Sequence, residues 1–157
     1  MYIYEAGIII GGIPTITVNY INPSEHEIDL IHKCALLSCI LNFAEILISP
    51  IESFESNRYN FAFKKDIILS SDLEETDVHG YFIINRHKQF NKNLPTKIIP
   101  ALEKIINEFK IRYTKRDFSY STQFIEFGAI IDKIIGISSK TIEQKVEMLF
   151  FNQNIEK

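Results

Sequence analysis

Four histidines and one acidic segment are the residues whose chemistry best suits a metal ion. His26 and His32 stand six residues apart in a predicted helix, so they point to different sides of it. No cysteine or carboxylate completes a four-ligand set around them, nor around His79 or His87. The acidic segment Asp72–Asp77 lacks the ligand spacing and the glycine of an EF-hand. We therefore predict surface histidines, a solvated acidic loop, and no metal or other cofactor.

The glycines, serines and cysteines show no catalytic pattern. Gly11-Gly12 would suit a phosphate loop, but neither Gly-x-x-x-x-Gly-Lys-Ser/Thr nor Gly-x-Gly-x-x-Gly follows. A double glycine between two apolar runs is typical of a β-hairpin turn. The serines and the cysteines Cys34 and Cys39 have no nucleophile elbow and no paired histidine. The sequence therefore predicts a protein that is not an enzyme.

Composition and charge narrow the class of protein. A chain of 157 residues with 46% hydrophobic residues is long enough for one good core. Its net charge of −3 gives no general reason to expect nucleic-acid binding. The apolar run Ala35–Ile48 is too short and too polar for a transmembrane helix. Because Cys34 and Cys39 would point apart on a helix and no signal peptide precedes them, we expect a cytoplasmic protein.

Basic residues gather in two parts of the sequence. Lys110, Arg112, Lys115 and Arg116 would form one patch with the segment Arg86–Lys88 if the fold brings them together. Such a patch would suit peripheral contact with anionic lipid, or an acidic partner. The alternative is that Lys110–Arg116 only complement the dipole at the end of a helix, and we favour this interpretation.

A long helix is the element around which the chain is organised. Pro23 precedes Ser24 and Glu27, which have the spacing of a capping box, and the predicted helix runs from Ser24 to Ile48. Its apolar arc is wide enough to be covered on more than one side. We expect a sheet on one face and either another helix or a second molecule on the other.

Alternating residues and turn signals predict the other elements. The fourth strand is expected to have a bulge at Lys65-Asp66, and Ser70–Asp77 and Arg86–Asn93 are expected to be loops. A helix that began at Pro95 would be kinked by Pro100. The predicted strands are Tyr2–Ile10, Ile13–Ile21, Ile51–Ser56, Tyr59–Leu69 and Val78–Asn85, and the predicted later helices run from between Leu94 and Pro100 to Tyr113 and from Ser121 to Gly136.

The last segment, residues 137–157, reads as an amphipathic helix separate from the domain at 1–136. Its large apolar side chains are costly to leave in water, at roughly 1.5–3 kcal/mol each. They must cover the domain's own surface, a second copy of the chain or a partner. The candidate partner-binding residues are Ile142, Val146, Leu149, Phe150 and Phe151.

The order ββαβββαα resembles the longin domain. The resemblance is carried by four segments: Gly7–Pro14, Leu41–Glu45, Gly80–Asn85 and Ile106–Phe109. It implies an α+β fold with a five-stranded antiparallel sheet, one helix on one face and two on the other. The stretch Phe124–Gly136 is also similar to the small adaptin chains, which are longin folds. Unlike longin SNAREs, the chain shows no coiled-coil segment after this domain.

The resemblance also implies a function. Longins and the related roadblock domains serve as non-catalytic interaction modules in small-GTPase regulatory and vesicle-trafficking complexes. It implies a homo- or heterodimer whose partner is a small GTPase or another longin or roadblock subunit. The alternative is a ligand-sensing domain similar to PAS or profilin folds, which would need an apolar pocket between sheet and helix.

Overall fold

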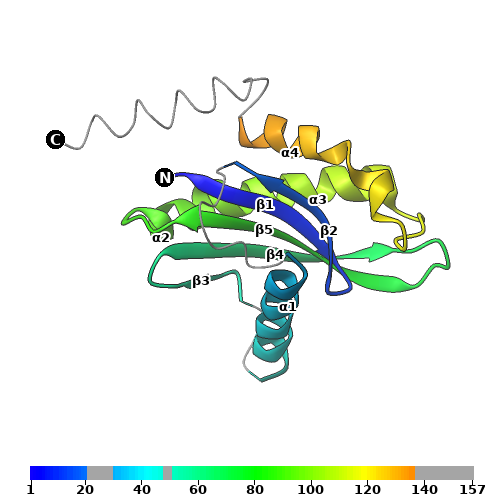
Figure 1. Ribbon diagram of the computed structural model, residues 1–157, viewed down its shortest axis with the longest axis horizontal. Helices are drawn as coiled ribbons and strands as arrows, with labels where there is room; N and C mark the ends of the chain where they lie inside the picture. The colour runs from blue at the N-terminus through cyan, green and yellow to red at the C-terminus, as the bar shows by residue number, and fades with distance from the viewer. Residues whose placement is uncertain (21–29, 48–50, 137–157) are drawn as a thin grey trace.

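The computed structural model describes residues 1–20, 30–47 and 51–136, which form an α+β fold around one open antiparallel sheet. The strand order is β2-β1-β5-β4-β3, with helices on both sides (Figure 1). The α+β class and the five-stranded antiparallel sheet are confirmed. The strands are β1 (Ile3–Ile10), β2 (Ile13–Asn19), β3 (Ser53–Glu55), β4 (Tyr59–Leu69) and β5 (Glu75–Asn85).

The first hairpin turns at the predicted glycines. Gly11 and Gly12 have φ of 54° and 83°, which glycine adopts without the steric penalty of a side chain. Pro14 lies in β2, the edge strand of the sheet, where its missing N–H disturbs the hydrogen bonding between strands least. The β1–β2 register shifts between Ile8 and Ile9, an irregularity that the sequence did not predict.

The β4–β5 hairpin is longer than predicted. Its register is unbroken from the pair Tyr59–Asn85 to the pair Leu69–Glu75, so the bulge predicted at Lys65-Asp66 was wrong. The predicted loop Ser70–Asp77 was also too long, because β5 already begins at Glu75. Lys65 and Asp66 fit within the regular strand because Lys65 pairs with Asp77 across the sheet and Asp66 pairs with Lys110 on a neighbouring helix.

Helix α1 (Leu30–Leu47) covers one face of the sheet, as Figure 1 shows. The predicted start of this helix, with its cap Ser24 and Glu27, lies outside the described residues. Leu37 and Leu41 form a core with four residues of the sheet, to which Ala44 adds a third buried position of α1. The sheet residues of this core include Ile9, Phe63, Tyr81 and Ile83.

A continuous helical segment covers the opposite face. It passes through α2 (Phe90–Asn93), the π-helical turn η1 (Leu94–Ile98) and α3 (Ile99–Tyr113). The predicted loop Arg86–Asn93 was therefore too long, because Phe90 is buried and begins the helix. The π turn precedes Pro100, whose ring could not enter a regular α-helix without a clash.

The last described helix is shorter than predicted. Ser121–Phe124 form a 3-10 turn, η2, and α4 (Phe127–Ile135) follows. Gly136 ends α4 with φ of 82° and donates its N–H to the carbonyls of Asp132 and Lys133, which confirms the predicted glycine cap. Phe109 of α3 meets Phe124 and Phe127 at ring-centroid distances of 5.4 and 5.2 Å. These rings join the helices to the larger core.

Candidate functional site

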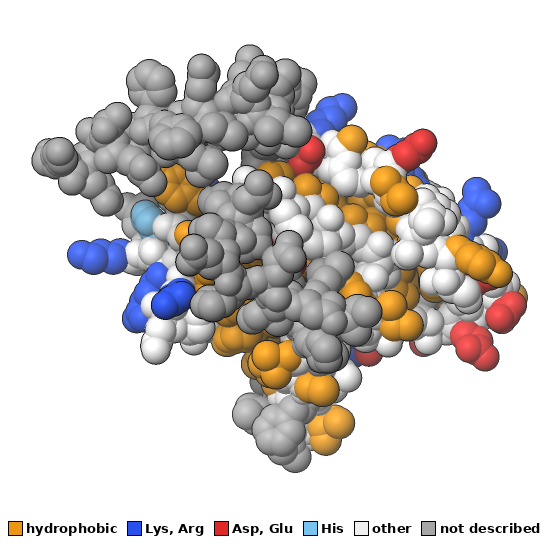
Figure 2. All heavy atoms as spheres, viewed as in Figure 1, with side chains coloured by type: hydrophobic (Ala, Val, Ile, Leu, Met, Phe, Trp, Pro, Cys, Tyr) orange, Lys and Arg blue, Asp and Glu red, His pale blue; other side chains and the backbone are white. Residues whose placement is uncertain are grey.

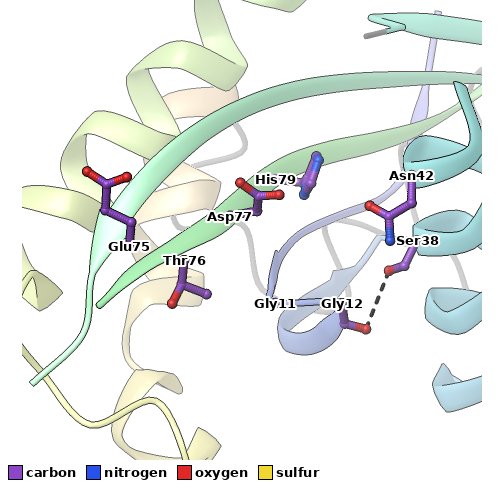
Figure 3. Close-up of a pocket in the computed structure, with 8 residues that line it drawn as sticks. All are labelled: Gly11, Gly12, Ser38, Asn42, Glu75, Thr76, Asp77 and His79. Carbon is purple, nitrogen blue, oxygen red and sulfur yellow. Dashed lines mark hydrogen bonds between the residues drawn. The ribbon is translucent and has the colours of Figure 1, made fainter. Parts of the chain in front are cut away.

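A cleft opens where the β1–β2 turn, α1 and β5 meet. It has a volume of about 400 Å³. Ser38 and Asn42 reach into it from α1, facing Asp77 and His79 on β5 (Figure 3). The residues that line it are Gly11, Gly12, Ser38, Asn42, Glu75, Thr76, Asp77 and His79.

Helical periodicity places the polar side of α1 at this cleft. Leu37, Leu41 and Ala44 are buried against the sheet. Ser38, Asn42 and Glu45 each follow one of these positions, so they form a neighbouring polar stripe on the same helix. Ser38 donates a hydrogen bond from Oγ to the carbonyl oxygen of Gly12, 3.4 Å away. This contact ties α1 to the first hairpin.

His79 is the buried titratable group of the cleft. It lies on β5, paired with Ile9 of β1 and Lys65 of β4, and only 7% of its surface is exposed. Burial lowers the pKa of His79, and the ammonium of Lys65 adds to this, while the carboxylates of Asp77 and Glu45 oppose it. The prediction of a surface histidine was wrong here, because β5 has neighbours on both sides.

A chain of ion pairs runs beside His79. Lys65 Nζ lies 2.6 Å from Glu45 Oε1 on α1 and 2.9 Å from Asp77 Oδ2 on β5. These contacts raise the pKa of Lys65 although burial alone would lower it. One ammonium group therefore joins the helix to two strands of the sheet.

The outer side of α1 is apolar and exposed. Leu36 and Ile46 are 60% and 80% exposed, and Cys39 between them is also exposed. Hydrophobic side chains appear on the surface of α1 in the lower part of Figure 2. The helix thus has three sides: an apolar side in the core, a polar side at the cleft, and this apolar outer side, defined here by Leu36, Cys39 and Ile46.

A buried polar contact lies further along the same sheet face. The hydroxyl of Tyr81 donates to Glu5 Oε1 at 2.7 Å, and Thr17 Oγ1 lies 3.3 Å from the same hydroxyl. A side chain at Gly7 would come within 2.7 Å of the Tyr81 ring atoms, so glycine makes room for this contact. The sequence analysis did not identify it, although Glu5 in a buried strand was a signal.

Several predicted site residues lie outside the described part of the chain. They include His26 and the side chain of His32. His87 is half-buried, and its Nδ1 accepts a hydrogen bond from the N–H of Gln89 at 3.1 Å. The predicted partner-binding residues of the tail also lie outside: Ile142, Val146, Leu149, Phe150 and Phe151.

The predicted basic patch does not form as one surface. Arg116 lies beside Ser70, at one end of the β4–β5 hairpin. Arg86 lies at the other end, where its N–H donates to the carbonyl oxygen of Arg58. Strands of this length separate the two groups by about 30 Å. Lys110 forms an ion pair with Asp66, and Arg112 forms one with Glu108.

The described residues offer neither a metal site nor a membrane span. Within residues 1–20, 30–47 and 51–136, no group of three or more histidines, cysteines or carboxylates could hold a metal ion. No helix in that part of the chain is long and apolar enough to cross a membrane. Comparisons with protein-family models, curated proteins and solved structures found no match.

Proposed function

We propose that this chain is a non-catalytic protein-interaction module of the longin type, acting in the cytoplasm within a small-GTPase regulatory or vesicle-trafficking-like complex. The element order and the placement of helices on both faces support this proposal: α1 covers one face, and α3 and α4 cover the other. The proposed partner is a small GTPase, a second copy of the chain, or another longin or roadblock subunit.

The observation that carries the proposal is the outer side of α1. Leu36, Cys39 and Ile46 are exposed on one side of a helix whose opposite side is already packed on the sheet. Several exposed apolar side chains on one side of a helix, unlike a single one, indicate an interaction site. The tail residues, with Phe150 and Phe151, would add to this surface or bind separately.

The ligand-sensing alternative has less support. It calls for an apolar pocket between sheet and helix, whereas the cleft at the β1–β2 turn is lined mainly by polar groups. Leu37 and Leu41 instead pack directly on Phe63 and Tyr81. If thermal-shift screening with apolar small molecules found stabilising ligands, the result would support the ligand-sensing alternative.

Binding to small GTPases tests the proposal. The full chain would be presented to a panel of GTPases loaded with GDP or with a non-hydrolysable GTP analogue. We expect binding that depends on the nucleotide, and that is lost in the double variant Leu36→Ser/Ile46→Ser. The matched control is Ile111→Ser/Ile125→Ser, which removes two isoleucines exposed elsewhere. Absence of GTPase binding in both states, in a chain that is also monomeric, would overturn the proposal.

Truncation after Gly136 tests the contribution of the tail. If the tail residues form the partner surface, the truncated chain stays folded and loses binding as the α1 variant does. If the α1 side alone forms it, the truncated chain binds as the full chain does.

A further inference from the structure

We propose that the cleft at the β1–β2 turn binds an alkylammonium or guanidinium group, carried by a free small amine or by a lysine or arginine side chain of a partner. The inference rests on the cleft itself and is independent of the proposed function. Its volume of about 400 Å³ falls in the range of small-ligand sites.

The first observation is the state of His79. Its side chain lines the cleft with only 7% of its surface exposed, and the described residues give its ring no hydrogen-bond partner. No ring nitrogen of His79 is among the fully buried, unpartnered atoms of the described residues, so its nitrogens are accessible from the cleft. Because burial disfavours its charged form, the imidazole offers an unprotonated nitrogen that can accept a hydrogen bond. A ligand with N–H donors would satisfy this nitrogen.

The second observation is the charge around the cleft. Asp77 and Glu75 line it, and Glu45 lies on the adjoining side of α1. Among the side chains that the structure describes, one ammonium stands against these three carboxylates, that of Lys65, which Glu45 and Asp77 share. The cleft therefore keeps an excess of negative charge, which attracts a cation and repels an anion.

The third observation is that the remaining polar groups can accept hydrogen bonds. The amide oxygen of Asn42 can accept, and Figure 3 shows this side chain reaching from α1 towards β5. Ser38 donates its proton to Gly12, so its oxygen lone pairs remain for a ligand. Several acceptors around one cavity suit a group with several N–H donors, which ammonium and guanidinium provide.

A metal ion fits the cleft less well than an organic cation. Asp77 and His79 are two candidate ligands, whereas structural and catalytic metal sites use three or four protein ligands. In the part of the chain that the structure describes, no third histidine, cysteine or carboxylate completes such a set. An ammonium or guanidinium group needs no fixed coordination number.

NMR titration of the ¹⁵N-labelled full chain tests the proposal. Methylguanidinium and n-butylammonium chlorides are the probes, and urea and sodium acetate at matched ionic strength are the neutral and anionic controls. We expect saturable shifts in the millimolar range for both cations, centred on Gly12, Asn42 and His79. Shifts that do not saturate, or that urea and sodium acetate produce equally, would overturn the proposal.

Two variants connect the binding to the cleft. Asp77→Asn should weaken cation binding by about two- to fivefold, because this carboxylate is partly exposed and its charge is screened. Glu126→Gln, which removes an exposed carboxylate on the other face, should bind as the wild type does. If Asp77→Asn fails to fold, Asn42→Leu at an exposed helix position takes its place. Unchanged affinity in a folded variant would refute the assignment.

A peptide distinguishes the two sources of the cation. An acetylated and amidated Leu-Lys-Leu peptide carries the same ammonium group beside apolar side chains that could reach the outer side of α1. If a partner's side chain is the natural ligand, the peptide binds more tightly than n-butylammonium and also shifts Leu36 and Cys39. If a free amine is the ligand, the peptide binds no better and these residues do not move.

Discussion

The two faces of the sheet are built differently. The face under α3 and α4 is closed by a large, mainly apolar core in which aromatic rings such as Phe109, Phe124 and Phe127 interlock. The face under α1 has a smaller apolar core and holds two buried polar residues, Glu5 and His79. It also carries the cleft and the exposed outer side of α1.

This difference between the two faces indicates that they have different roles, one in stability and one in binding. Apolar burial supplies most of the favourable free energy of folding, and the larger core lies on the α3 face. Buried polar groups and exposed apolar side chains cost free energy, and the α1 face has two of the three buried polar residues of the described chain as well as the exposed Leu36 and Ile46. We infer that the α3 face holds the fold together and that the α1 face binds partners.

The largest expected effect comes from comparing one leucine in each core. Leu102→Ala on α3 should lower the free energy of unfolding by about 3–5 kcal/mol, because this side chain is fully buried and leaves a cavity. Leu41→Ala on α1 should cost less, about 2–3 kcal/mol, because the smaller core can relax around the gap. Urea unfolding measures both. A larger loss for Leu41→Ala would reverse the assignment of the two faces.

The next largest effect on stability is expected from comparing substitutions at Gly7 and Gly128. Gly7→Ala places a methyl group 2.4 Å from the carbonyl oxygen of Ile16 and 2.6 Å from the Tyr81 ring, so it should destabilise the fold by about 1–3 kcal/mol. Gly128→Ala on α4 is the matched control, where the nearest atom, on Val18, lies at 3.4 Å. The control should be neutral or stabilising by up to about 1 kcal/mol. Equal stability of the two variants would show that Tyr81 does not need this space.

His79 makes stability depend on pH in a defined direction. Its pKa lies below the ordinary value of 6.5, because burial and Lys65 outweigh Asp77 and Glu45. The unfolded chain therefore takes up a proton at a higher pH than the folded chain does. The contribution of His79 to the free energy of unfolding is fully present above pH 6.5. It is lost as the pH falls from there through the folded-state pKa of His79.

Urea unfolding between pH 7.5 and 5 checks this direction. The variant His79→Gln should show a flatter decrease in the free energy of unfolding, and the other histidines are common to both chains. An identical pH dependence in the wild type and the variant would contradict a buried, uncharged His79.

The smallest effect is expected at the ion pair between β4 and α3. Lys110 Nζ lies 2.6 Å from Asp66 Oδ2, and both side chains are partly exposed. Burial would raise the pKa of Asp66, but the hydrogen bonds from Lys110 and from the N–H of Ile67, together with the charge of Lys110, outweigh it and lower the pKa. Asp66→Asn should therefore cost only about 0.2–1 kcal/mol at neutral pH, less in high salt. A loss as large as that of Leu41→Ala would contradict the view that apolar burial dominates on this face.

The sequence predicted those features that depend on neighbouring residues. Gly11-Gly12 marked the first turn, Tyr81–Ile84 marked a buried strand, and Gly136 marked the end of a helix. These signals come from backbone conformation and local periodicity, which a single segment carries within itself.

The features that the sequence did not predict depend on contacts between distant segments. Lys65 and Asp77 appeared to belong in a bulge and a loop, because their ion pair forms only once β4 and β5 are aligned. His79 appeared to be exposed, because its burial is set by β1 and β4 on either side. The cleft is likewise lined by residues of three separate elements, so no local sequence motif predicted it.

The most direct test of the central claim is the mass of the full chain in solution, measured by light scattering over a range of concentrations. Wild type is compared with Leu36→Ser/Ile46→Ser and with the control Ile111→Ser/Ile125→Ser. If the outer side of α1 pairs two chains, the wild type and the control have the mass of two chains and the α1 variant that of one. An α1 variant that stays dimeric would contradict the claim, and so would a wild type that has the mass of one chain at every concentration and also binds no small GTPase.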